Sequence, residues 1–191
     1  MAHVLIFGAS GGIGRETVTA SLDAGHRVRG FARSAAAIQC DSDGFEKWPG
    51  DATNKDDVSR ALAGVDIVVQ ALGVRTADLF KPVDLFSKAT RLLVEAMKQQ
   101  GVGRLIAVTG FGAGDSREAI GALQQLPFRF LLGRAYDDKD VQEKIIKDSG
   151  LDWTIVRPGI LTQGPKTGQC QVLLERADWR NGVISRADVA K

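Results

Sequence analysis

The glycines near the amino terminus have the clearest chemical meaning in this sequence. Residues 8–14, GASGGIG, read GxxGxxG. Glycines at this spacing let backbone N–H groups approach a pyrophosphate at the start of the following helix. The pattern alone is weak, because a plain tight turn between a strand and a helix has the same composition. The cofactor-binding residues predicted on this turn are Gly8, Ser10, Gly11, Gly12, Ile13 and Gly14.

The surroundings of this turn favour the chemical interpretation. An apolar run, residues 4–7, ends at the first glycine, and Ile13, Val18 and Leu22 then recur with helical spacing. A strand, a glycine turn and an amphipathic helix inside a βαβ unit form the setting in which this motif binds a dinucleotide. We therefore predict a dinucleotide-binding site.

The residues after the second predicted strand distinguish between the two nicotinamide cofactors. An NAD site usually has Asp or Glu there to bind the ribose 2′-hydroxyl, whereas this strand is followed by Arg33 and Ser34. Arg33 offers a permanently charged planar group suited to a 2′-phosphate, and Ser34 can donate one more hydrogen bond. NADP(H) is thus predicted over NAD(H), the alternative being that Arg33 is a solvated charge. For Arg15, a cofactor contact and an ordinary exposed helix charge are equally compatible with its position.

Further candidates follow from a general property of open parallel sheets. Ligands bind in the crevice outside the carboxyl ends of the strands. Each residue there is individually compatible with simple turn or strand-ending chemistry, and it is the joint position that favours a cofactor role, with Asp51 placed to reach the adenine edge. These further predicted cofactor contacts are Asp51, Ala52, Leu72, Gly73, Thr109, Pro158, Gly159 and Ile160.

The elements that position these residues alternate between strand and helix patterns. Short connections between them predict the α/β class, a Rossmann-type doubly wound parallel sheet in a single domain over residues 1–191. Strands are predicted at 4–7, 27–32, 45–49, 65–72, 104–109 and 152–156. Helices are predicted at 13–22, 56–63, 85–100 and 137–149.

Two segments interrupt this alternation and are expected to border the substrate, residues 110–135 and residues 161–191. In the first, Asp115 and Glu118 have capping-box spacing before a short helix, which Pro127 separates from the next apolar cluster. In the second, a strand is predicted at 169–174. A helix begins after Ser185, so the natural protein is expected to continue past Lys191.

Composition excludes several classes of partner and of site. The chain has 25 basic and 23 acidic residues, a net charge of +2, which argues against nucleic-acid or membrane-surface binding. Cys40 and Cys170 form no CxxC pair and predict no metal site. No signal peptide or membrane-length apolar run is present. We expect a cytoplasmic protein with two free thiols that acts on a small molecule, in an oligomeric state that the sequence leaves open.

Six short segments together match one family pattern. They are GASGGIG at 8–14, FARS at 31–34, GDA at 50–52, ALG at 71–73, SGLDWTIVRPG at 149–159 and ISRADVA at 184–190. In these segments, over nearly its whole length, the chain resembles the atypical short-chain dehydrogenases/reductases, in the subgroup of NmrA-like proteins and biliverdin/flavin reductases. The resemblance implies a Rossmann domain, NAD(P)H binding and, often, reduction of flavins, quinones or related conjugated acceptors.

Proton donation is where the chain departs from this pattern. Members of the wider superfamily that the chain resembles share a YxxxK pair. The lysine lowers the pKa of the tyrosine so that the tyrosine can donate a proton, and a nearby serine assists it. Here Tyr136 has Lys139 at the third following position and Asp140 at the fourth, and a carboxylate there disfavours the tyrosinate. Tyr136 and Lys139 still share a helix face, so they remain candidate catalytic residues beside Thr109. The alternative is that Tyr136 packs at a helix start and Lys139 is a solvated charge.

The resemblance gives these positions a second interpretation. Lys139 with Glu143 fits the KxxxE spacing of the family, which leaves Ala135 where the tyrosine would stand. The fifth predicted strand likewise ends at Thr109 and is followed by Gly110, so the serine usual at this place is missing. Neither histidine, His3 or His26, lies near this region in sequence, so acid chemistry by histidine is not expected.

Two functions fit these residues. The first is an NADPH-dependent reductase that transfers hydride to a flavin, quinone or similar conjugated acceptor, with apolar walls from Phe111, Phe128 and Phe130. The second is a non-catalytic NADP(H)-binding redox sensor of the NmrA-like type. A nucleotide-sugar epimerase or dehydratase fits less well, because such an enzyme would require a YxxxK pair and a larger carboxyl-terminal substrate region.

Overall fold

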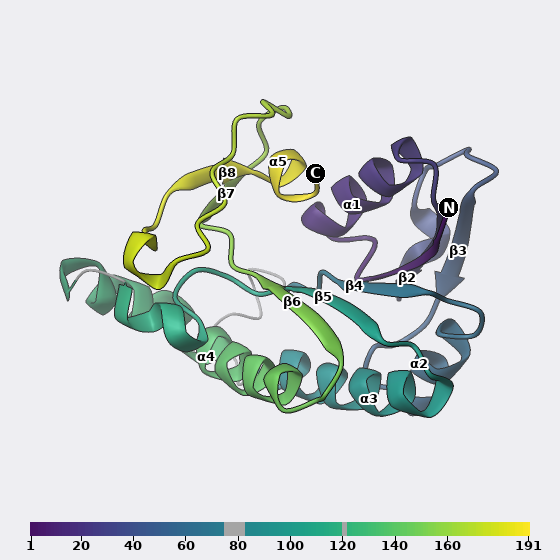
Figure 1. Ribbon diagram of the computed structural model, residues 1–191, viewed down its shortest axis with the longest axis horizontal. Helices are drawn as coiled ribbons and strands as arrows, with labels where there is room; N and C mark the ends of the chain where they lie inside the picture. The colour runs from purple at the N-terminus through teal and green to yellow at the C-terminus, as the bar shows by residue number, and fades with distance from the viewer. Residues whose placement is uncertain (75–82, 120–121) are drawn as a thin grey trace.

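Six parallel strands form the central sheet of this protein (Figure 1). The computed structural model describes residues 1–74, 83–119 and 122–191, and for residues 122–132 it describes the main chain alone. The strands are β1 (His3–Phe7), β2 (Arg27–Ala32), β3 (Phe45–Pro49), β4 (Ile67–Gln70), β5 (Arg104–Val108) and β6 (Asp152–Val156). Their order in the sheet is β3-β2-β1-β4-β5-β6. This doubly wound order confirms the Rossmann-type α/β prediction.

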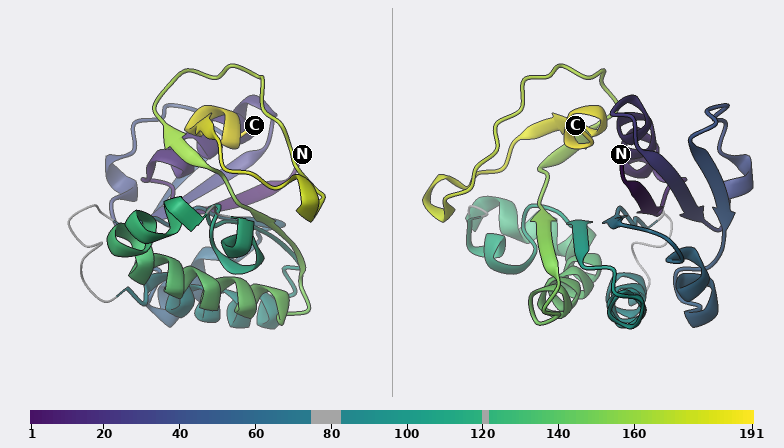
Figure 2. Two further views of the ribbon diagram at one scale, coloured as in Figure 1. Left: turned by 90° about the vertical axis from the view of Figure 1, so that its left-hand side faces the viewer. Right: turned by 45° about the vertical axis from the view of Figure 1, so that its right-hand side comes forward.

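Helices cover both faces of the sheet (Figures 1 and 2). They are α1 (Gly12–Asp23), α2 (Lys55–Ala61), α3 (Leu85–Gln100), α4 (Ala122–Lys147) and the short α5 (Arg186–Val189). On β1, Val4 and Ile6 pack with Val18 of α1, whereas Leu5 and Phe7 belong to the core formed with α2, α3 and α4. All four of these β1 side chains are buried, which is why the strand reads as a continuous apolar run.

The glycine turn between β1 and α1 requires two positions without side chains. Gly8 has φ of +103°, and a Cβ there would lie 2.8 Å from the carbonyl oxygen of Ala71, just beyond β4. A Cβ on Gly14 would overlap the carbonyl oxygen of Gly8. The end of β1, the end of β4 and the first turn of α1 therefore meet at main-chain contact distance.

Two sequence predictions are wrong in the region after β5. The capping-box residues Asp115 and Glu118 lie inside a 3₁₀ helix, η3 (Gly114–Ala119). The helix predicted at 137–149 begins fifteen residues earlier, because α4 runs from Ala122 to Lys147 and includes Pro127. A proline there removes one main-chain hydrogen bond near the start of a 26-residue helix, so the remaining turns maintain the helix.

The tail after β6 also differs from its prediction. Residues 169–174 form no strand, and Val172 and Leu174 are exposed. Two other short segments, β7 (Ile160–Thr162) and β8 (Val183–Ser185), pair in parallel apart from the main sheet. The residues between them include one 3₁₀ turn, η4 (Arg176–Asp178). The helix predicted after Ser185 is α5, which packs against α1 above the sheet (Figure 1).

Replacing Gly14 by alanine tests the close approach at the glycine turn. We expect Gly14→Ala to lower the free energy of unfolding by about 1–3 kcal/mol, because the new methyl group overlaps main-chain atoms that have no room to move. Denaturant unfolding measures the change. The matched control is Gly103→Ala, where an added Cβ meets no atom within 4 Å; equal losses in both variants would contradict the packing argument.

Candidate functional site

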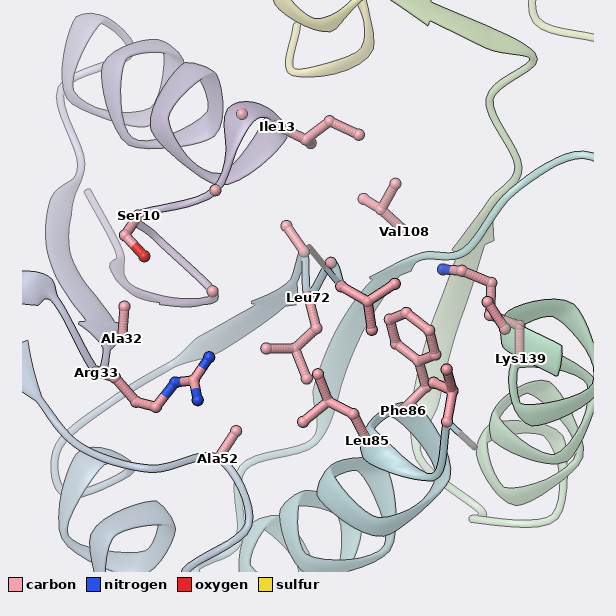
Figure 3. Close-up of a pocket in the computed structure, with 18 of the residues that line it drawn as sticks. Ser10, Ile13, Ala32, Arg33, Ala52, Leu72, Leu85, Phe86, Val108 and Lys139 are labelled. Carbon is pink, nitrogen blue, oxygen red and sulfur yellow. The ribbon is translucent and has the colours of Figure 1, made fainter. Parts of the chain in front are cut away.

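A cleft of about 1070 Å³ opens at the carboxyl ends of the strands (Figure 3). The glycine turn, the segments after β2, β3 and β4, the start of α3 and the middle of α4 surround it. The predicted site residues that line it are Gly8, Ser10, Gly11, Gly12, Ile13, Arg33, Ser34, Asp51, Ala52, Leu72, Gly73, Thr109, Tyr136 and Lys139. The structure thus brings together most of the predicted site.

Four of the predicted contacts lie outside this lining. Gly14 packs against the main chain of Gly8 in the glycine turn. Pro158 accepts a hydrogen bond at its carbonyl oxygen from the N–H of Phe111, 2.8 Å away, Gly159 packs against Gly182, and Ile160 begins β7 with its side chain largely exposed. The predicted walls Phe128 and Phe130 are among the side chains that are not described.

Polar and charged groups gather at the β2–β3 end of the cleft. The exposed side chain of Arg33 extends into the cleft (Figure 3). The Oδ1 atom of Asp51 accepts hydrogen bonds from the N–H and the hydroxyl of Thr53, both 2.8 Å long. These bonds, with the charge of Arg33 adding to them, hold the pKa of Asp51 below its usual range. Asp51 is therefore a carboxylate fixed near a cation.

Apolar side chains line the cleft at the ends of β4 and β5. Leu72, Leu85, Phe86 and Val108 face the cavity there (Figure 3). The start of α3, which contributes two of them, has no side-chain cap of its own, but Asp138 of α4 accepts a hydrogen bond from the N–H of Phe86 at 2.8 Å. A carboxylate from one helix therefore positions the apolar wall provided by the next.

Lys139 lies between the cleft and the core. Its Nζ donates to the carbonyl oxygen of Thr109 at 2.9 Å and lies 4.1 Å from the ring centre of Phe86. Burial lowers the pKa of Lys139 to about 8, against the opposing effects of Glu143 and Asp138. This lysine is therefore buried and hydrogen-bonded, contrary to the alternative of a solvated charge.

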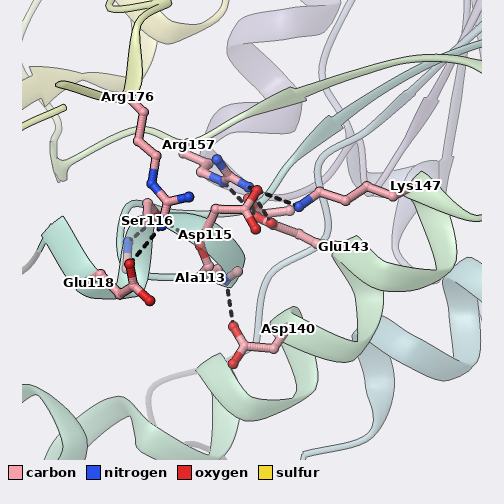
Figure 4. A network of polar contacts seen from close by, with 12 residues as sticks. Ala113, Asp115, Ser116, Glu118, Asp140, Glu143, Lys147, Arg157 and Arg176 are labelled. Carbon is pink, nitrogen blue, oxygen red and sulfur yellow. Dashed lines mark hydrogen bonds and ion pairs between the residues drawn. The ribbon is translucent and has the colours of Figure 1, made fainter. Parts of the chain in front are cut away.

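The Thr109 hydroxyl is also hydrogen-bonded within the protein. Thr109 Oγ1 donates to Oε1 of Glu143 at 2.8 Å, and Arg157 donates to both oxygens of Glu143, at 3.0 and 2.6 Å. Lys147 extends the cluster through Asp115 at 2.6 Å (Figure 4). Glu143 is almost fully buried, so these bonds satisfy a carboxylate that links β5, α4 and the end of β6.

Ala135 and Tyr136 line the cleft one turn of α4 before Lys139. The Tyr136 hydroxyl lies against Gly110, 2.6 Å from where a Cβ would stand, and burial raises the pKa of Tyr136. Ala135 is buried and lines the cleft together with Lys139. At the position that the KxxxE alignment assigns to the tyrosine of the superfamily, the cleft thus has a methyl group.

Several lining residues were not predicted individually from the sequence, among them Leu85, Phe86, Val108, Leu161 and Arg186. Arg186 lies over the glycine turn, since a Cβ on Gly12 would be 2.7 Å from its Cδ and its Nε. The segment ISRADVA contained Arg186, but nothing local in that segment indicates a contact with the opposite end of the chain. Arg15, for which two interpretations stood open, donates from Nε to the carbonyl oxygen of Ser10 at 3.0 Å.

A doubly wound sheet with a glycine turn opening on a cleft at the strand ends defines a dinucleotide-binding protein of the Rossmann type. Residues 8–191 match the model of the NAD(P)H-binding family. The chain belongs to this family, so a nicotinamide dinucleotide is its cofactor class.

Named relatives refine this placement. An uncharacterised chloroplastic protein of Arabidopsis thaliana is 32% identical over 98% of this chain and 69% of its own length. The uncharacterised sugar epimerase YhfK of Bacillus subtilis is 30% identical over 98% of this chain and 84% of its own. The structure of ChuY, an anaerobilin reductase from Escherichia coli O157:H7, superposes with a TM-score of 0.80 at 28% identity, covering 98% of this chain and 86% of ChuY.

These similarities confirm the resemblance to atypical, NmrA-like short-chain dehydrogenases/reductases and place the chain among NAD(P)H-dependent oxidoreductases. Within the described ranges, no helix is long and apolar enough to cross a membrane. The same ranges hold no group of three or more metal-binding side chains, and Cys40 and Cys170 are not disulfide-bonded.

The lowered pKa of Lys139 predicts a pH dependence of stability. Between pH 8 and 10.5 the unfolded chain binds a proton that the folded protein releases, so this group makes folding more favourable as pH rises. The unfolding free energy of the wild type, minus that of Lys139→Met, should increase across this window by up to about 3 kcal/mol. Denaturant unfolding at several pH values measures it.

Lys144→Met is the matched control, because this lysine lies on the exposed side of the same helix. A flat difference between the wild type and Lys139→Met over the same window would show that the buried ammonium group does not titrate there.

Proposed function

We propose that this protein is an NADPH-dependent reductase that transfers hydride to a flavin, a quinone or a similar flat conjugated acceptor. The observation that carries the proposal is the methyl group of Ala135, one turn before the buried Lys139, at a cleft that has no superfamily tyrosine. An alcohol-forming reduction needs an acid at the developing alkoxide, whereas a reduced flavin or quinone takes its proton from solvent. A cleft in which the Thr109 hydroxyl and the Lys139 ammonium group are already hydrogen-bonded to the protein suits the second reaction.

The proposed cofactor position follows the sheet. Arg33 and Ser34 would hold the 2′-phosphate, Asp51 and Ala52 would border the adenine, and the glycine turn would face the pyrophosphate. The nicotinamide would then lie beside Gly73 and Thr109, close to Ala135 and Tyr136. In the proposed reaction the chain contributes orientation, with little acid catalysis.

We further propose that the segments 110–135 and 161–191 border the acceptor. Leu161 and Ala135, one from each segment, line the cleft and support this assignment. The structurally similar ChuY protein is named as an anaerobilin reductase, which supports a reductase function. Cytoplasmic residence remains a prediction from the sequence.

A redox sensor that binds NADP(H) without turnover is the second candidate. It is favoured by the hydrogen bonds that commit Thr109 and Lys139 to the protein. The two candidates differ in turnover, since a sensor would bind both oxidised and reduced cofactor and reduce nothing.

The acceptor reaction is the direct test of this function. Steady oxidation of NADPH, followed by its absorbance, is expected with FMN or a quinone, and absence of turnover with every such acceptor would favour the sensor. Tyr136→Phe is expected to change this rate by less than about threefold, because solvent supplies the proton. A loss of about 100-fold or more would instead make Tyr136 the general acid.

The cofactor preference is tested by Arg33→Ala. We expect it to weaken NADPH binding by about 2 kcal/mol, or about 30-fold, through loss of a charge-assisted contact, with a much smaller effect on NADH. Equilibrium binding of each cofactor measures both. Equal losses for the two cofactors would refute a 2′-phosphate site at Arg33.

A further inference from the structure

Arg186, the first residue of α5, has no role in the proposed function. Its side chain crosses the glycine turn, with Cδ and Nε each 2.7 Å from where a Cβ of Gly12 would stand, and it lines the cleft. Within the described part of the chain, its guanidinium makes no hydrogen bond or ion pair. A permanent cation that lines a cleft and makes no ion pair among the described residues favours an anion as its partner.

The main chain beneath Arg186 presents a positive potential to the same place. Helix α1 begins at Gly12, its cap residue Gly11 supplies no side-chain hydrogen bond, and its first turn has no acidic side chain. The first N–H groups of this 12-residue helix and the guanidinium therefore approach one another from two sides. Two independent donor groups converge on one location.

A separate polar cluster fixes the backbone that carries Arg186. Ser185 caps α5 by accepting from the N–H of Asp188 at 3.0 Å. The buried carboxylate of Asp188 accepts from the Ser185 hydroxyl at 2.8 Å and from the N–H groups of Thr167 and Gly168 at 2.9 and 2.8 Å. These bonds hold the pKa of Asp188 at about 2, so the carboxylate stays charged.

We propose that Arg186 binds the pyrophosphate of the nicotinamide dinucleotide, so that α5 completes the cofactor site above the glycine turn. Asp188 is then a positioning residue that acts through Arg186. A guanidinium matches this ligand because its planar N–H groups can donate two parallel hydrogen bonds to phosphate oxygens. The inference rests on the proposed cofactor and does not depend on the acceptor.

Equilibrium binding of three probes tests the proposal: NADPH, NADH and adenosine 2′-monophosphate. Arg186→Met should weaken NADPH and NADH by the same factor, on the order of 10- to 100-fold, because both contain the pyrophosphate. It should leave adenosine 2′-monophosphate unchanged. Arg33→Ala should give the opposite pattern, weakening NADPH and adenosine 2′-monophosphate while sparing NADH.

Arg180→Met is the matched control, since this exposed arginine of the same tail donates to Gln171, away from the cleft lining. Wild-type affinity of Arg186→Met for both dinucleotides would overturn the proposal. So would unchanged cofactor binding with a raised KM for the acceptor, which would assign Arg186 to the acceptor. Dinucleotide binding without any acceptor reduction would overturn the proposed reductase alone.

Two more variants address folding and the role of Asp188. Arg186→Lys keeps the charge and loses the planar group, so a smaller loss of both dinucleotides is expected even if the methionine variant does not fold. Asp188→Ala should weaken dinucleotide binding in the wild type and add nothing in Arg186→Met. A full additional loss in the double variant would show that Asp188 does not act through Arg186.

Discussion

The rest of the structure depends on one close approach of main chains, where β1, β4 and α1 meet at Gly8. The N–H of Gly8 donates to the carbonyl oxygen of Phe31 at 2.9 Å, and the N–H of Ala71 donates to that of Phe7 at 2.8 Å. The segments after β2 and β4 are thereby held against the start of α1. The glycine turn of the proposed dinucleotide contact is thus positioned by main-chain geometry, whereas Arg186 above it depends on the side chains of Ser185 and Asp188.

A second, polar constraint operates at the other end of the cleft. Glu143 of α4 accepts hydrogen bonds from Thr109, which follows β5, and from Arg157, which follows β6. Lys139 of the same helix donates a further hydrogen bond to the Thr109 carbonyl oxygen. Such a satisfied buried cluster fixes α4 on the sheet. In the superfamily pattern, this region carries the proton donors. Here its polar groups serve the packing of α4, which is why the reaction we propose requires little from them.

Sequence patterns predicted the elements whose signals are local. The apolar run of β1 and the glycine turn depend on neighbouring residues, so the sheet and most of the cleft lining followed from them. The start of α4 did not, because Pro127 is a local stop signal that a long helix overrides. Nor did β7 and β8, whose three-residue strands are too short for a periodic pattern. Arg186 reaches Gly12 only through the tertiary fold.

The parallel pairing of β7 and β8 has a thermodynamic consequence for the tail. Parallel strands cannot be joined by a tight hairpin, so the chain between them makes a long excursion, residues 163–182, almost entirely exposed (Figure 2). Ordering such a segment opposes folding entropically. Apart from the bonds of Thr167 and Gly168 to Asp188, few contacts, such as Arg176 with Glu118, offset this cost. The tail therefore belongs to the part of the molecule that opens at the lowest free energy, and hydrogen exchange should be fastest there.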